Sequence, residues 1–160
     1  MGNSFRAHLG TCLGVASSLL LSDPPPNVHI AHAIARLSAS LLSALLATPE
    51  LHSISTAGGK PAAQMAKMVR RFGVLNSAAC SIVPQQSFDA EMLHFMRISL
   101  DLPLSLLPFF SADMRARLLP EQIMIGLKSV DPIHRRSALQ CQRALCEFQA
   151  DRHQDAFLVS

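Results

Sequence analysis

The chain has 160 residues, of which 49% are hydrophobic and 16% are charged, and its formal net charge is +3. Such a composition excludes a disordered chain, which would combine few hydrophobic residues with a high net charge. Acidic and basic residues interleave after Lys60, so the sequence lacks the strong positive field of a nucleic-acid-binding protein. We therefore expect a single domain over residues 1–160 that does not bind nucleic acid.

The residue types favour helices throughout. Trp and Tyr, which are common in strands, are absent, while residues with good helix propensity are abundant. The sequence predicts an all-α fold, an irregular bundle of six to eight helices.

Formal charge is spread unevenly along the chain. Of its 25 Lys, Arg, Asp and Glu residues, only four lie in the first 59 positions, namely Arg6, Asp23, Arg36 and Glu50. The N-terminal helices thus carry more apolar surface than one core of this size comfortably hides, and exposed apolar patches mark partner sites. This feature predicts a protein that binds other protein subunits or itself.

The first predicted helix covers residues 4–21 and ends at Asp23 and the three prolines that follow it. Residues 1–26 are a candidate for a separable N-terminal helix. The apolar run over residues 9–21 looks like part of a signal peptide, but Ser and Thr interrupt it and no small-x-small cleavage site follows. A membrane-surface role for this helix stays open as an alternative.

Asn27 is the predicted N-cap of a long second helix. Its apolar positions recur at spacings of three and four residues, the pattern of a buried helix face. We expect this stripe to be partly core and partly interface: Ile30, Ile34, Leu37, Leu41 and Leu45. Two histidines and an arginine within residues 28–47 argue against a membrane span. The helix should end at Thr48, and residues 53–59 are predicted to form a flexible loop.

A third helix begins at residues 59–61. It carries Lys67, Arg70 and Arg71 at helical neighbour spacing, so we expect them to share a face and to form a charged rim for a partner. Gly73 and Asn76 should weaken the end of this helix, leaving a separate apolar piece over residues 78–83.

The remaining elements are shorter until the last helix. Ser87 is the predicted cap of a helix reaching residue 100, prolines cut residues 101–120 into short turns, and Ser111 caps one of these. A helix over 120–129 follows, and Asp131 with Pro132 begins the last helix. Its predicted inward stripe consists of Ile133, Ser137, Cys141, Leu145 and Phe148.

Residues that could carry chemistry form no complete motif. His29 and His32 are three apart on one helix, but a metal site would need two further ligands. Glu91 and His94 supply only half of a two-metal bundle signature. We expect the cysteines to be buried thiols in a reducing compartment; there are four, Cys12, Cys80, Cys141 and Cys146. We therefore predict no enzyme activity, no cofactor and no metal, with a small helical enzyme or metal-binding protein as the alternative.

The segment Arg70-Arg71-Phe72-Gly73-Val74-Leu75, together with Gly126-Leu127, Arg135-Arg136 and Leu139, carries a family resemblance. It is similar to segments of the helical accessory subunits of the type III secretion sorting platform, a family that includes a rhizobial nodulation protein. The resemblance covers residues 60–148, although this chain is shorter than the family members and lacks their tryptophans. It implies a cytoplasmic, non-catalytic adaptor in protein transport, bound to other platform subunits at the inner face of a membrane.

Overall fold

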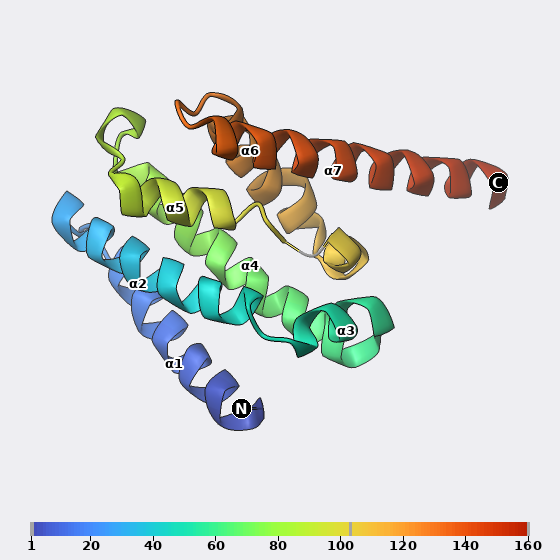
Figure 1. Ribbon diagram of the computed structural model, residues 1–160, viewed down its shortest axis with the longest axis horizontal. Coiled ribbons are helices and arrows are strands. Elements are labelled where there is room, and N and C mark those ends of the chain that lie inside the picture. Colours follow the sequence, from blue (N-terminus) through green and yellow to red (C-terminus); the bar gives the residue numbers. More distant parts are fainter. Residues whose placement is uncertain (1, 103, 160) are drawn as a thin grey trace.

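The computed structural model describes residues 2–102 and 104–159, with side chains for residues 8–102 and 104–152. The described residues form helices and connecting turns without a strand, which confirms the predicted all-α bundle (Figure 1). The α-helices are α1 (Gly2–Leu20), α2 (Val28–Leu46), α3 (Glu50–Ala57), α4 (Gly59–Ile82), α5 (Ala90–Ile98), α6 (Leu119–Leu127) and α7 (Pro132–Val159). The 3₁₀ segments are η1 (Gln85–Ser87) and η2 (Leu104–Phe109), and η3 (Met114–Leu118) is π-helical.

Helix α4 is the centre of the fold. It contacts α1, α2 and α3, and it also contacts α6, η2 and η3 (Figure 1). Its buried positions include Val69, Phe72, Leu75 and Ala79, which recur at spacings of three and four residues. The apolar stripe of α4 therefore holds the N-terminal and C-terminal helices on one core.

Helix α1 is part of that core. Leu9, Leu13, Ala16 and Leu20 follow one another at spacings of four, three and four residues, and all are buried. Arg71 of α4 donates a hydrogen bond of 3.4 Å from Nη2 to the carbonyl oxygen of Gly10, which joins the two helices. Helix α1 thus packs against α4 through these residues.

The segment predicted as a loop over residues 53–59 is a helix for most of its length. Helix α3 includes residues 53–57, Gly58 connects it to α4, and Gly59 is the first residue of α4; the two glycines have φ of 74° and 72°. The hydroxyls of Ser55 and Thr56 donate to the carbonyl oxygen of His52 within the same helix. Because Leu51 and Ser55 are also buried, tertiary packing overrides the weak helix propensity of this polar run.

Two other boundaries differ from the prediction. Helix α4 is continuous through Gly73 and Asn76, because both residues are buried against neighbouring elements. Asp89, and not Ser87, caps α5, accepting a hydrogen bond of 2.8 Å from the backbone N–H of Met92. By contrast, the predicted caps Asn27, Ser111 and Asp131 each accept a backbone N–H as expected.

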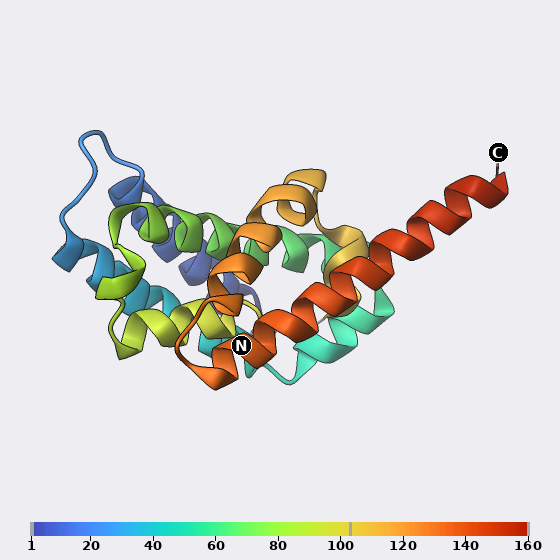
Figure 2. The ribbon, with the colours of Figure 1, turned by 90° about the horizontal axis from the view of Figure 1, so that it is seen from above.

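The buried stripe of α7 lies one residue away from the predicted one at its start. Ile133 is 57% exposed, and His134 takes its place in the interior. The inward positions are therefore His134, Ser137, Ala138, Cys141 and Leu145, the i, i+3, i+4, i+7 pattern of one helix face. Beyond them α7 extends outward from the other helices (Figure 2).

Helix α2 is the only helix of the described residues that is long and apolar enough to cross a membrane. Length and composition alone are weak evidence, because core helices of soluble proteins meet the same criterion. Seven residues of α2 are buried in this fold, including Ile34, Leu42 and Leu45.

Candidate functional site

The predicted stripe on α2 divides between the core and the surface. Ile34 and Leu45 are buried, whereas Ile30 and Leu37 are 43% and 46% exposed, and Leu41 is half-buried. Ile30 and Leu37 are seven residues apart, so they lie on the same side of the helix two turns apart. We call Ile30, Leu37 and Leu41 the α2 face; Arg36 is exposed on the same helix, about 100° around its axis from Leu37.

Exposed apolar side chains are concentrated in the part of the sequence that contains this face. Of the eleven large hydrophobic residues exposed among the described side chains, six lie between residues 15 and 37: Val15, Leu19, Leu21, Val28, Ile30 and Leu37. Residues 24–49 contain no Asp or Glu, and Arg36 is the one formally charged residue there. The α2 face is therefore apolar with a positive edge.

The three predicted rim residues of α4 differ in exposure and in their contacts. Lys67 is exposed, but Arg71 is half-buried against α1, where its guanidinium lies beside Gly10 and Gly14. Arg70 forms an ion pair of 3.2 Å with Asp113, which also accepts hydrogen bonds from Arg117. These bonds from Arg117, and the one from Arg70, hold the pKa of Asp113 below its ordinary value. Among the three, only Lys67 is fully available to a partner.

The histidines and cysteines form no metal-ligand cluster among the described residues. No group of three potential metal ligands is found there. His32 Nδ1 lies 3.4 Å from a carboxylate oxygen of Asp89, and His94 Nδ1 lies 2.9 Å from the Arg97 guanidinium. Cys141 is buried as predicted, but Cys146 is exposed, because it lies on the outer side of α7.

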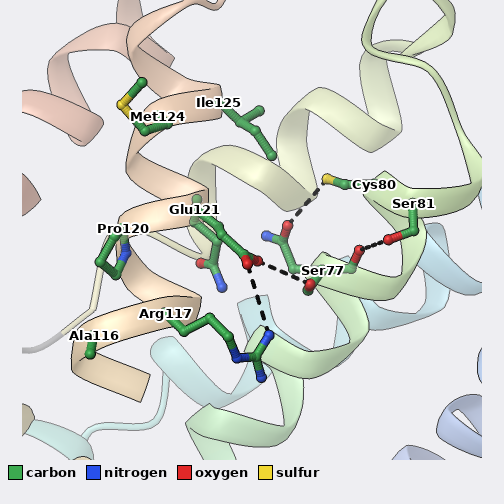
Figure 3. Close-up of a pocket in the computed structure, with 11 residues that line it drawn as sticks. Ser77, Cys80, Ser81, Ala116, Arg117, Pro120, Glu121, Met124 and Ile125 are labelled. Atoms are coloured by element: carbon green, nitrogen blue, oxygen red, sulfur yellow. Dashed lines mark hydrogen bonds and ion pairs between the residues drawn. The ribbon is translucent and has the colours of Figure 1, made fainter. Parts of the chain in front are cut away.

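An open groove lies between the C-terminal half of α4 and the η3–α6 segment, with a volume of about 640 Å³ (Figure 3). Ser77, Cys80 and Ser81 line it from α4, and Arg117, Glu121 and Ile125 line it from the other side. Glu121 reaches across the groove, accepting a hydrogen bond of 3.2 Å from the Ser77 hydroxyl, and lies 3.9 Å from Arg117.

The groove is also lined by two buried amides that lack hydrogen-bond partners. Asn76 is 1% exposed and Gln122 is 3% exposed, and Asn76 Nδ2 and both amide atoms of Gln122 are unpaired. A buried polar group without a partner costs about 1–3 kcal/mol. Three such atoms beside one cavity are therefore an unusual cost for a stable fold to carry.

Cys80 lies beside the oxygen of the Asn76 amide. Its thiol is 3.6 Å from Asn76 Oδ1 and 3.4 Å from Met96 Sδ, and its one proton can be donated to either atom. Burial, together with the charge of Glu121, raises the pKa of Cys80 to about 12, so the thiol keeps its proton. Because the oxygen of Asn76 faces the thiol, its NH₂ group is the part left unpaired.

The local backbone at the groove is irregular. In η3 the N–H of Leu119 bonds to the carbonyl oxygen of Met114, five residues earlier, which is the π-helical pattern. Single turns of π-helix occur often at functional sites. Here the turn carries Ala116 and Arg117 to the groove.

The sequence analysis did not predict this groove, although the sequence indicates that one of its two buried amides, Asn76, is unusual. Asn76 occupies the same apolar stripe of α4 as Phe72 and Ala79, and a polar residue at such a position needs a partner. Gln122 has no comparable signal, because its burial depends on how α6 packs against α4 at Gly73. A Cβ atom at Gly73 would lie 3.2 Å from Gln122 Nε2.

No protein-family model, no curated protein and no solved structure matches this chain.

Proposed function

We propose that the protein is a non-catalytic helical adaptor whose α2 face binds an amphipathic helix of a partner protein. The observation that carries the proposal is the concentration of exposed large hydrophobic residues in α1, α2 and their connection. Monomeric proteins rarely expose such residues together, and a patch of them marks an interaction site.

The charge around the face indicates the chemistry of the partner. Arg36 is exposed on α2 and precedes Leu37 in sequence, and Lys67 is exposed on α4, which packs against α2. Because residues 24–49 include Arg36 and no Asp or Glu, the charge of this segment favours an acidic helix over a basic one. An apolar stripe with spacing i, i+3, i+4, i+7 on that helix would match the seven-residue separation of Ile30 and Leu37.

The proposal does not depend on the resemblance to secretion-platform subunits. Phe72, Gly73 and Leu75 of the shared segment are buried in the core, and Arg70 and Arg71 hold contacts within the chain. These residues have structural roles that any helical protein could use. A role in type III secretion therefore stays a prediction from the sequence.

A designed peptide tests the docking surface directly. The probe is a fluorescent helical peptide of about 20 residues with leucines along one face and glutamates on both flanks. Fluorescence anisotropy should show saturable binding, and Ile30→Asn and Leu37→Asn should each weaken it roughly tenfold, the loss typical of a central apolar contact. Arg36→Glu and Lys67→Glu should also weaken peptide binding, and the loss of affinity should be larger at low salt than at high salt.

Two control experiments make the test specific. Ile133→Asn and Leu139→Asn remove hydrophobic residues of α7 that are at least as exposed as Ile30 and Leu37, and should leave the affinity unchanged. A peptide with lysines in place of the glutamates should bind more weakly. The proposal that the α2 face binds the peptide would be wrong if both peptides bound equally well. It would also be wrong if the α7 variants lost as much affinity as the α2 variants. Sedimentation of the protein alone would identify self-association as a competing occupant.

A further inference from the structure

We propose that the groove between α4 and η3–α6 binds a small, uncharged ring compound that presents an imide or lactam edge. The proposal concerns a different surface from the α2 face and a different class of ligand.

The unpaired amide atoms define what the groove can recognise. Asn76 Nδ2 and Gln122 Nε2 are donors, and Gln122 Oε1 is an acceptor. An imide edge presents two acceptors and one donor, so it offers one partner for each of these three atoms. A lactam edge would satisfy two of the three atoms. A carboxylate or phosphate would leave Gln122 Oε1 unpaired and would lie beside the carboxylate of Glu121.

The rest of the groove suits the body of such a compound. Its volume of about 640 Å³ falls within the usual range of small-molecule sites. Pro120, Met124 and Ile125 supply apolar surface, and Met124 is half exposed at the edge of the groove (Figure 3). A ring with its polar edge toward Asn76 and Gln122 would lie with its carbon atoms against these residues.

Entry of the ligand requires a movement of one side chain. Glu121 spans the groove to Ser77, and the unpaired amide atoms are not in contact with solvent. Arg117 already lies 3.9 Å from Glu121 and is half exposed. Glu121 can therefore exchange the neutral Ser77 hydroxyl for the Arg117 guanidinium, which opens the groove without leaving the carboxylate unpaired.

Glutarimide, a six-membered cyclic imide, is the probe that tests the edge. The full-length ¹⁵N-labelled chain is titrated with it at concentrations up to tens of millimolar and followed by two-dimensional NMR. The side-chain NH₂ signals of Asn76 and Gln122 should shift saturably. N-Methylglutarimide has the same ring without the N–H and should bind about fivefold more weakly, the loss expected for one hydrogen bond. Uracil carries the same edge and serves as a second probe. If uracil binds more tightly than glutarimide, the ligand class is a nucleobase. If glutarimide binds more tightly, the ligand class is a non-aromatic imide.

A pair of variants separates recognition from folding. Gln122→Met keeps the length of the side chain and should weaken glutarimide binding about fivefold while the thermal transition stays cooperative. Gln140→Met, at an exposed position of α7, should bind as the unmodified chain does. The proposal is overturned if glutarimide and its N-methyl analogue bind equally, if Gln122→Met binds with unchanged affinity, or if no saturable shift occurs.

Discussion

His134 shows how one buried side chain can set the response of the protein to pH. It is 1% exposed, and neither ring nitrogen has a hydrogen-bond partner. Burial lowers its pKa, as does the charge of Arg97, while Asp131 and Asp101 act in the opposite direction. The neutral imidazole is therefore the form that fits between α6 and α7.

The free energy of unfolding should consequently fall in mild acid. The unfolded chain takes up a proton at His134 near pH about 6.5, whereas the folded chain does so only at a lower pH. Stability from this residue is complete above the unfolded pKa and is lost as the pH falls through the folded pKa. Urea unfolding at several pH values should show a smaller loss in mild acid for His134→Leu than for the unmodified chain. His52→Leu, at an exposed histidine of α3, is the control and should keep the original pH dependence.

Among the elements, α6 and α7 are joined by an unusually close approach at Gly126. A Cβ atom at this position would lie 2.7 Å from the Cβ of Ala138 and 3.1 Å from His134 Nε2. The first neighbour is rigid, because the Cβ of alanine has no rotamer to change. Packing of the two helices at their present distance therefore requires glycine.

Gly126→Ala should destabilise the protein by about 1–3 kcal/mol, the usual cost of overpacking, despite the better helix propensity of alanine. Gly10→Ala in α1 is the matched control, because its Cβ would meet only the Arg71 guanidinium at 3.7 Å. That variant should be neutral or more stable by up to about 1 kcal/mol. Equal effects of the two substitutions in chemical denaturation would contradict the close packing of α6 on α7.

Elements whose boundaries are determined by neighbouring residues in the sequence were predicted correctly, and elements that depend on tertiary packing were not. Asn27 and Asp131 combine a cap residue with a proline or an apolar run nearby, so the local sequence was sufficient. Residues 53–57 were misread because Ser and Thr have low helix propensity, and only the packing of Leu51 and Ser55 decides their state. The start of the α7 stripe was wrong for a related reason: His134 looks polar in sequence, and its burial follows from Gly126, a residue on another helix.

The candidate sites were less predictable than the fold. Ile30 and Leu37 belong to the same periodic stripe as Ile34 and Leu45, and periodicity cannot tell which members a later helix covers. Likewise, the spacing of Arg70 and Arg71 gave no indication that the first would meet Asp113 and the second the backbone of Gly10. Contacts between residues more than forty positions apart decide these cases.

For the whole molecule, the integration of α1 has a direct test. Leu13 is fully buried between α1 and the rest of the core. Leu13→Ala should cost about 2–5 kcal/mol, as for other leucines truncated in a packed interior. Val15→Ala, at an exposed position two residues later, should change the free energy of unfolding by less than about 0.5 kcal/mol. Similar small effects of both substitutions in urea unfolding would show that residues 1–26 form a separable unit after all.

The length of α7 has a practical consequence for work with this protein. At about 1.5 Å per residue its 28 residues span about 42 Å, and its far end lies away from α1 and α2 (Figure 1). A chip or bead attached at the C-terminus is therefore carried at a distance from Ile30 and Leu37, so immobilisation there should leave both side chains accessible. An attachment at the N-terminus places the support next to α1 and is the poorer choice of handle.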